Sequence, residues 1–157
     1  MWKKEIIKPK TAVSHPSTCS NMVKIGPFLF IAGQVAMFED RTMVTGYKDL
    51  DQEGRKKLRA DENIGAHFRE EKIAAQTYHI FTNIKRLIED AGGTMDDLFL
   101  LRILLCDINY FPVVERVRNM FYDADKMPII TTMADVALCP PDALVEIEAE
   151  AFIPEKA

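Results

Sequence analysis

The stretch that decides the fold runs from Met127 to Pro154 and reads MPIITTMADVALCPPDALVEIEAEAFIP. Two apolar-rich segments in it flank a turn that contains adjacent prolines. In the second segment, from Val145 to Ile153, apolar residues alternate with Glu146, Glu148 and Glu150, which is the period of a β-strand with one buried face. The three carboxylates therefore share one face of a predicted strand. Either all three carboxylates form a solvated outer surface, or one of them takes part in catalysis.

Upstream of this stretch, the hydrophobic pattern predicts two helices and a further strand. Apolar residues recur every three or four positions from Glu71 to Ala91, and Gly92-Gly93 ends that helix. A second apolar stripe runs from about Pro112 to Ala124, and proline suits the first turn of a helix. Between them, the run from Leu98 to Ile108 predicts a strand buried on both faces. Arg102 in that strand needs a carboxylate partner, on the last strand or on a neighbouring subunit.

The N-terminal part of the sequence predicts an extended arm and a β-hairpin. Residues 1–12 contain a proline and show no periodicity, which is typical of an arm. Two short runs, from Ser20 to Ile25 and from Phe28 to Ala32, flank Gly26-Pro27, and turn residues between apolar runs indicate a hairpin. Gly33 then ends the second strand, or it lets a backbone N–H approach a ligand closely.

Residues 37–70 are the least regular part of the sequence. They mix charged residues and glycines with few apolar ones, and a loop of this length in a compact domain is often a lid or a binding loop. A surface insertion without a role is the alternative. Within the segment, Asp49 to Arg59 predicts a short exposed helix, and Met43 to Thr45 a further strand.

The order of these elements predicts an α+β domain, with a β-sheet and both helices on one face. A chain of 157 residues suffices for one domain with its own core, so residues 1–157 are expected to form a single domain. The sheet face without helices needs a cover. If that face is substantially apolar, self-association is the simplest solution.

The composition of the chain disfavours several classes of function. A formal net charge of −4 argues against non-specific nucleic-acid binding, and no apolar run is long enough to span a bilayer. The 3 cysteines and 3 histidines are scattered, so they give neither a disulfide framework nor the spacing of a metal site. The N-terminus lacks the apolar core of a secretory signal, and a cytoplasmic location is therefore expected.

Several signals together, in this order and spacing, resemble the Rid family, which is also called YjgF-like. They are IGPFLFIAGQ at residues 25–34, Gln76 and Asn83 in a helix that ends in AGG, DINYF at residues 107–111, a proline opening the penultimate strand, and VEIEAEAF at residues 145–152. The resemblance covers roughly residues 13–153. It implies a chorismate-mutase-like fold, in which three subunits pack their sheets into a central β-barrel with ligand clefts between subunits.

The best-known members of the Rid family hydrolyse reactive enamines and imines to ketones and ammonia without a metal or organic cofactor. The first Glu of their EIE motif corresponds to Glu146, and the resemblance implies that it positions and activates water. In those members, an arginine two residues after the strand-opening proline grips the substrate carboxylate. That position is Ile130 here, which cannot bind a carboxylate in this way. A neutral, cationic or more apolar ligand is therefore expected.

Other positions that line the family's cleft also differ in this sequence. Glu115 stands in place of an asparagine, Ala32 in place of a serine, and Cys19 lies near the usual position of a tyrosine. The substrate contacts implied by the resemblance are Gly33, Gln34, Cys19, Phe111, Glu115, Ile130, Thr131 and Thr132.

The sequence therefore predicts a cofactor-independent deaminase or hydrolase that acts on an enamine or imine intermediate in a specialised pathway. The alternative is a non-catalytic trimer that binds a small metabolite or a partner protein, because several cleft positions have changed. Nuclease activity has been attached to some relatives of the family, but it fits poorly with the acidic charge balance. A cysteine mechanism through Cys19 or Cys139 is a further hypothesis, although neither has an evident histidine partner.

Overall fold

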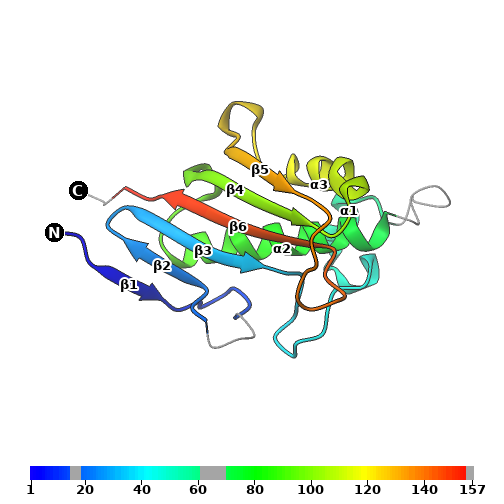
Figure 1. Ribbon diagram of the computed structural model, residues 1–157, viewed down its shortest axis with the longest axis horizontal. Coiled ribbons are helices and arrows are strands. Elements are labelled where there is room, and N and C mark those ends of the chain that lie inside the picture. The colour runs from blue at the N-terminus through cyan, green and yellow to red at the C-terminus, as the bar shows by residue number, and fades with distance from the viewer. Residues whose placement is uncertain (15–18, 61–69, 155–157) are drawn as a thin grey trace.

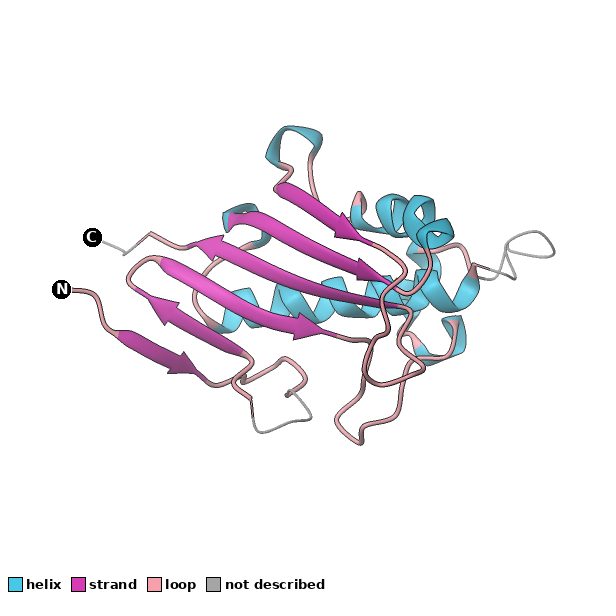
Figure 2. Cartoon of the chain, in the orientation of Figure 1, coloured by secondary structure: helices cyan, strands magenta, loops and turns pink. Residues whose placement is uncertain are grey.

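The computed structural model describes residues 1–14, 19–60 and 70–154. A six-stranded mixed sheet, in the order β1-β2-β3-β6-β4-β5, lies in front of the helices in Figure 1. The strands are β1 Lys4–Ile7, β2 Met22–Ile25, β3 Phe28–Gln34, β4 Leu98–Leu105, β5 Ile129–Met133 and β6 Val145–Phe152. The helices are α1 Gln52–Lys57, α2 Glu71–Asp90 and α3 Phe111–Arg118. Four 3-10 turns complete the described elements, namely η1 Tyr47–Asp49, η3 Met95–Asp97, η4 Ile108–Tyr110 and η5 Ala124–Lys126 (Figure 2).

The last strand, β6, lies inside the sheet rather than at its edge. It pairs antiparallel with β3 on one side and with β4 on the other, while β4 pairs parallel with β5. Val145, Ile147 and Ala149 are at most 1% exposed, and the glutamates between them are only half-buried. The alternation in the sequence therefore predicted this strand correctly, including which of its faces is buried.

Helices α2 and α3 cover one face of the sheet and leave the other open, as predicted (Figure 1). The apolar stripe of α2 is buried against β3 and β6, and the predicted helix from Glu71 to Ala91 is confirmed. α3 is shorter than predicted, because it ends at Arg118 and the chain turns there. That turn lets Phe121 reach α2, where its ring stacks on Phe81 with 5.3 Å between the ring centroids.

The N-terminal segment, where an extended arm was expected, contributes the edge strand β1. Lys4–Ile7 pairs antiparallel with β2, so its backbone groups take part in the sheet. The following residues are fixed to the end of α2 by Asp90. Its carboxylate accepts hydrogen bonds from the N–H groups of Lys10 at 2.7 Å and of Thr11 at 2.9 Å.

The described part of residues 37–70 packs against α2. Val44, Leu50 and Leu58 join the hydrophobic core, and these few apolar side chains hold the segment in place. The short helix predicted within 49–59 is confirmed as α1, but the strand predicted near 43–45 is wrong, because only an isolated bridge links Met37 with Met43. Residues 61–69 of the expected insertion lie outside the described residues.

The buried amide of Gln76 ties two loops to α2. Its Nε2 donates to the carbonyl oxygens of Val44 and Asp142, at 3.0 Å each, and its Oε1 accepts from the N–H of Leu144 at 2.8 Å. The side chain of Gln76 is 0% exposed, so its amide depends on these three partners for its hydrogen bonds. Gln76 thereby fixes the turn that leads into β6.

The open face of the sheet is apolar at both ends and charged in its centre. At the centre, Arg102 of β4 places Nη2 2.8 Å from Glu150 Oε1 and Nη1 3.4 Å from Glu148 Oε2, which confirms the predicted partner on the last strand. Exposed apolar side chains surround this cluster, namely Ile6, Ile25, Phe30, Ile129, Met133 and Phe152. Within one chain, β4 is covered on one face only, so the expected burial on both faces is not met.

Candidate active site

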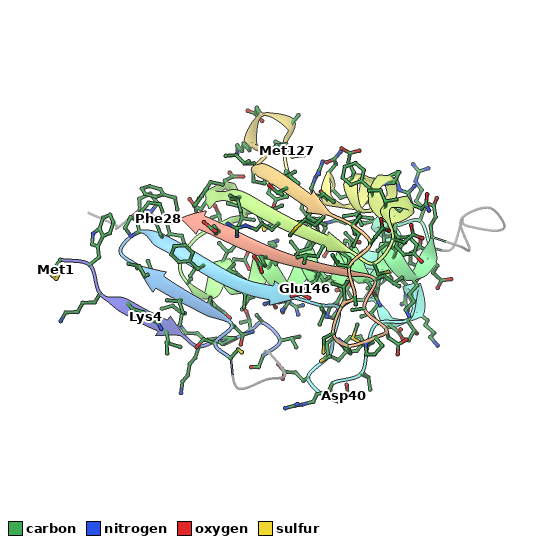
Figure 3. The ribbon with its side chains drawn as sticks, in the orientation of Figure 1. Met1, Lys4, Phe28, Asp40, Met127 and Glu146 are labelled. Carbon is green, nitrogen blue, oxygen red and sulfur yellow. The ribbon has the colours of Figure 1, made fainter. Side chains whose placement is uncertain are left out.

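Glu146 lies on the open face of the sheet, at the point where β3 bulges. The pairing register between β3 and β6 shifts between Ile31 and Gln34, so the residues between them leave the regular ladder. Glu146 Oε1 occupies the space that a Cβ atom on Gly33 would fill. A Cβ atom there would displace the carboxylate, which rests against the backbone of β3. Figure 3 shows Glu146 on the face without helices, beside the end of β3.

The surroundings of the Glu146 carboxylate make it more basic than an ordinary glutamate. The residue is half-buried, and no hydrogen-bond donor among the described residues contacts it. Burial raises the pKa of Glu146, and the negative charge of Glu148, two residues along the same face, raises it further. A carboxylate with a raised pKa and unused lone pairs can accept a proton from water, as a general base must.

Replacing Glu148 with Gln is expected to lower the pKa of Glu146, because one of the two causes of its elevation is removed. The carboxylate of Glu146 would then keep its base form to a lower pH than in the parent protein. An NMR titration of the Glu146 carboxyl carbon measures this shift directly. Glu150→Gln is the matched control, since Glu150 lies on the same face and does not contribute to the elevation. Equal titration curves for the two variants would contradict this account.

The side chain of Gln34 turns away from the open face and holds the bulge from the buried side. Its Nε2 donates to the carbonyl oxygen of Ala32 at 2.8 Å, and its Oε1 accepts from Asn83 Nδ2 at 2.9 Å. Asn83 in turn accepts from the N–H of Val13 at 2.7 Å. These contacts give Gln34 a structural part in placing Gly33. The sequence identified Asn83 only as an amide in a helix motif, and its hydrogen bonds to Val13 and Gln34 now show that it helps to form the site.

The expected contacts on β5 are divided between the two faces of the sheet. Ile130 and Thr132 are in register with fully buried residues of β4, so both point to the helix side, where Ile130 packs against the core. Thr131 pairs with Arg102 and therefore shares the open face with Glu146, which lies two strands away and two residues further along, at roughly 12 Å. A single chain thus does not bring Ile130 and Thr132 together with Glu146.

The other predicted contacts are placed as follows. Phe111 is half-buried at the start of α3, and Glu115, one turn further on, is exposed and lies 3.4 Å from Arg118 Nη2. Cys19 is exposed. Its neighbour Ser20 lines a hollow of about 330 Å³ on the sheet, which extends past Ala32 to the Arg102 cluster. Their part in binding stays a prediction.

No group of three or more His, Cys, Asp or Glu side chains in the part of the chain that the structure describes is arranged to hold a metal ion. No helix among the described residues has the length and apolar character needed to cross a bilayer.

The profile of the family described as Endoribonuclease L-PSP matches residues 10–153. This chain belongs to the L-PSP family. A RutC family protein from Pyrococcus abyssi is 26% identical over 149 residues, which cover 95% of this chain and 97% of the relative. A 2-iminobutanoate/2-iminopropanoate deaminase from Dermatophagoides farinae is 27% identical over 149 residues, covering 95% of this chain and 96% of the relative.

Solved structures from the same family share the fold. A Klebsiella pneumoniae protein proposed to be an endoribonuclease is 28% identical, with a TM-score of 0.79, covering 85% of this chain and 99% of that one. The Rid family protein YyfA from Yersinia pestis is 24% identical, with a TM-score of 0.73, covering 96% of this chain and 100% of that one. The resemblance to the Rid family and the chorismate-mutase-like α+β fold are therefore confirmed.

Proposed function

We propose that this L-PSP protein is a cofactor-independent hydrolase of imines or enamines, in which Glu146 is the general base. The observation that carries the proposal is the Glu146 carboxylate, which has a raised pKa and no donor among the described residues and rests against Gly33. A relative of similar length is named an iminobutanoate and iminopropanoate deaminase, which supports the same class of reaction. Endoribonuclease activity is not part of the proposal, since three glutamates on the open face would repel a phosphate backbone.

The reaction needs one water and one base. Glu146 takes a proton from water while the water oxygen bonds to the carbon of the protonated C=N group, which gives a neutral tetrahedral amino alcohol. The carboxyl group then gives this proton to nitrogen and the C–N bond breaks. As the C=O bond forms, the hydroxyl proton passes to the Glu146 carboxylate, and the products are a ketone or aldehyde and ammonia, which carries that proton away as ammonium. An enamine enters the same route after it tautomerises to the imine. The acidic surroundings favour a protonated imine, because a cation next to several carboxylates is stabilised.

The complete site is proposed to form between copies of the chain, in a homotrimer whose sheets meet along their open faces. Two observations support this arrangement. The open face carries six exposed apolar side chains, and Ile130 lies on the opposite face of the sheet from Glu146. A cleft that contains both therefore needs a second copy. Sedimentation equilibrium should give three times the chain mass of 17.9 kDa, and a monomer would contradict the proposal.

The test of function is ammonia release from imines that are generated in situ. One substrate is 2-iminopropanoate, formed from serine by a dehydratase, and the other is a carboxylate-free imine, formed from benzylamine by a flavin amine oxidase. We expect the protein to accelerate ammonia release from the second imine more than from the first, because Ile130 offers no cation. If neither reaction is accelerated, while either imine or its product binds, the protein is a non-catalytic metabolite-binding member of the family.

Replacing Ile130 with Arg is expected to raise the rate with 2-iminopropanoate by about tenfold or more, because a charge-assisted hydrogen bond contributes about 1.5–3 kcal/mol. The comparison is made on kcat/KM for ammonia release. Met120→Arg is the control, since this residue is 38% exposed just after α3, away from the open face and from the family's arginine position. A similar gain in both variants would mean that added positive charge, not its position, causes the effect.

A further inference from the structure

A second pocket, of about 240 Å³, lies against the outer side of α2. Its walls come from α2, from the segment that contains η1 and the start of α1, and from Val13 and Phe38. Because α2 covers the buried face of the sheet, this pocket and Glu146 are on opposite sides of it. The apolar part of the lining consists of Val13, Phe38, Leu50 and Tyr78.

Three charged side chains line this pocket, and the charge of Lys48 acts on one of them, Asp49. Arg86, Asp49 and Asp51 form no salt bridge within the described part of the chain. Asp49 Oδ2 accepts from the N–H and hydroxyl of Thr45, both at 2.6 Å, and Asp51 Oδ1 accepts from the N–H of Gly54 at 2.7 Å. Asp49 also accepts a hydrogen bond from the backbone of Gly46. Burial acts to raise the pKa of Asp49, but the hydrogen bonds from Thr45 and Gly46 and the charge of Lys48 outweigh it and keep the group ionised at neutral pH.

His79 also lines this pocket, and a hydrogen bond to Met37 fixes its tautomer. Its Nε2 lies 3.2 Å from the carbonyl oxygen of Met37, and a carbonyl can only accept, so Nε2 carries the proton. Burial lowers the pKa of His79, and the nearby charge of Arg86 lowers it further, so the ring is neutral at pH 7. The other ring nitrogen, Nδ1, is then unprotonated. Phe38 packs edge-on against the ring, with 5.0 Å between the centroids, which limits its rotation.

We propose that this pocket binds a free amino acid with an apolar side chain. Its carboxylate would pair with Arg86, its ammonium group with Asp49 and Asp51, and its side chain would lie against the apolar wall. A simple amine would leave Arg86 without a counter-ion, and a simple acid would do the same for the two aspartates. The volume lies below the roughly 300–1,000 Å³ of pockets for drug-sized ligands, which suits a ligand of amino-acid size.

The test is isothermal titration calorimetry with L-alanine, L-valine, L-leucine and L-phenylalanine. At least one of them is expected to bind. For leucine, isopentylamine lacks only the carboxylate and 4-methylpentanoate lacks only the ammonium group; the equivalent pair is used for whichever amino acid binds best. Each single-group analogue should bind about tenfold more weakly or worse, which is the loss expected for one charged hydrogen-bonded contact. Absence of binding for all four amino acids would overturn the proposal, as would an amine that binds as well as its parent.

Variants locate the binding to this pocket. Arg86→Gln should weaken amino-acid binding by about tenfold and leave binding of the amine analogue unchanged. Lys85→Gln is the matched control, because Lys85 is the adjacent cation on α2 and does not line the pocket. Equal effects of the two substitutions would place the binding elsewhere. Glu146→Gln should bind the amino acid as the parent protein does, so the outcome is independent of whether Glu146 hydrolyses imines.

Discussion

Replacing Glu146 with Gln is expected to lower the rate of imine hydrolysis by about 10²- to 10⁴-fold, the range that general-base catalysis contributes. Glutamine keeps the shape that fits against Gly33, but it cannot take a proton from water. Ammonia release under single-turnover conditions measures the loss at the chemical step. The loss should fall mainly on kcat, because proton transfer from water belongs to the chemical step.

Glu150→Gln is the control for this substitution, because it removes a carboxylate from the same strand face. Glu150 is paired with Arg102, and its loss should change the rate by less than about threefold, as expected for a group outside the reacting atoms. A loss in Glu150→Gln that matches the loss in Glu146→Gln would mean that the charge of the whole face matters, and Glu146 would have no special role.

Thermal unfolding separates a chemical effect of Glu146→Gln from damage to the fold. The pKa of Glu146 is raised by burial, so its charged form is disfavoured in the folded state. That cost is present at neutral pH. It disappears once the pH falls below the pKa that the Glu146 carboxyl group has in the unfolded chain. The neutral glutamine should therefore raise Tm at pH 7 and leave it unchanged in acid. A lower Tm at neutral pH would indicate that the substitution disturbs the structure.

Replacing Gln76 with Leu is expected to lower the free energy of unfolding by about 2–5 kcal/mol, because each buried polar group left without a partner costs about 1–3 kcal/mol. Leucine is similar in size, so the effect comes from the lost hydrogen bonds to Val44, Asp142 and Leu144 rather than from a cavity. Urea unfolding with an unchanged slope measures the loss as a lower midpoint.

Gln52→Leu provides the comparison for this stability effect. Gln52 begins α1 and is exposed, so the same substitution there should change the free energy of unfolding by less than about 0.5 kcal/mol. A loss below about 1 kcal/mol for Gln76→Leu would show that the turn before β6 finds other partners, and that Gln76 does not hold it in place.

Much of the fold follows from local patterns in the sequence. The period of two in β6 and the three- and four-residue spacing in α2 each identify a buried face. Two such apolar faces are expected to pack against each other. The pairing of Arg102 with Glu148 and Glu150 follows in the same way, since a guanidinium among apolar residues needs a carboxylate. The edge strand β1 was not predicted, because four residues in a lysine-rich stretch are too few to show a clear hydrophobic alternation. These residues are a strand because they pair with β2.

The candidate site was predicted less completely than the fold. The EIE motif and the alternation of β6 identify Glu146. Its contact with Gly33 depends on a β-bulge, which the residue pattern of β3 does not predict. The division of Ile130 and Glu146 between opposite faces requires the register of three strands to be known. The pocket beside α2 joins His79 to residues about thirty positions upstream, in a segment without periodicity, so only the tertiary structure brings its charges together.

The central position of β6 governs the order in which the sheet can be assembled. β3 and β4 do not pair with each other, and each is hydrogen-bonded to β6. A ribosome makes residues 145–152 after every other strand, so until then the chain holds a three-stranded and a two-stranded piece whose inner edges are unpaired. Unpaired edges invite contacts with other chains. Completion of the sheet is therefore a late, long-range step, and a nascent chain that stalls before β6 exposes the edges on which aggregation begins.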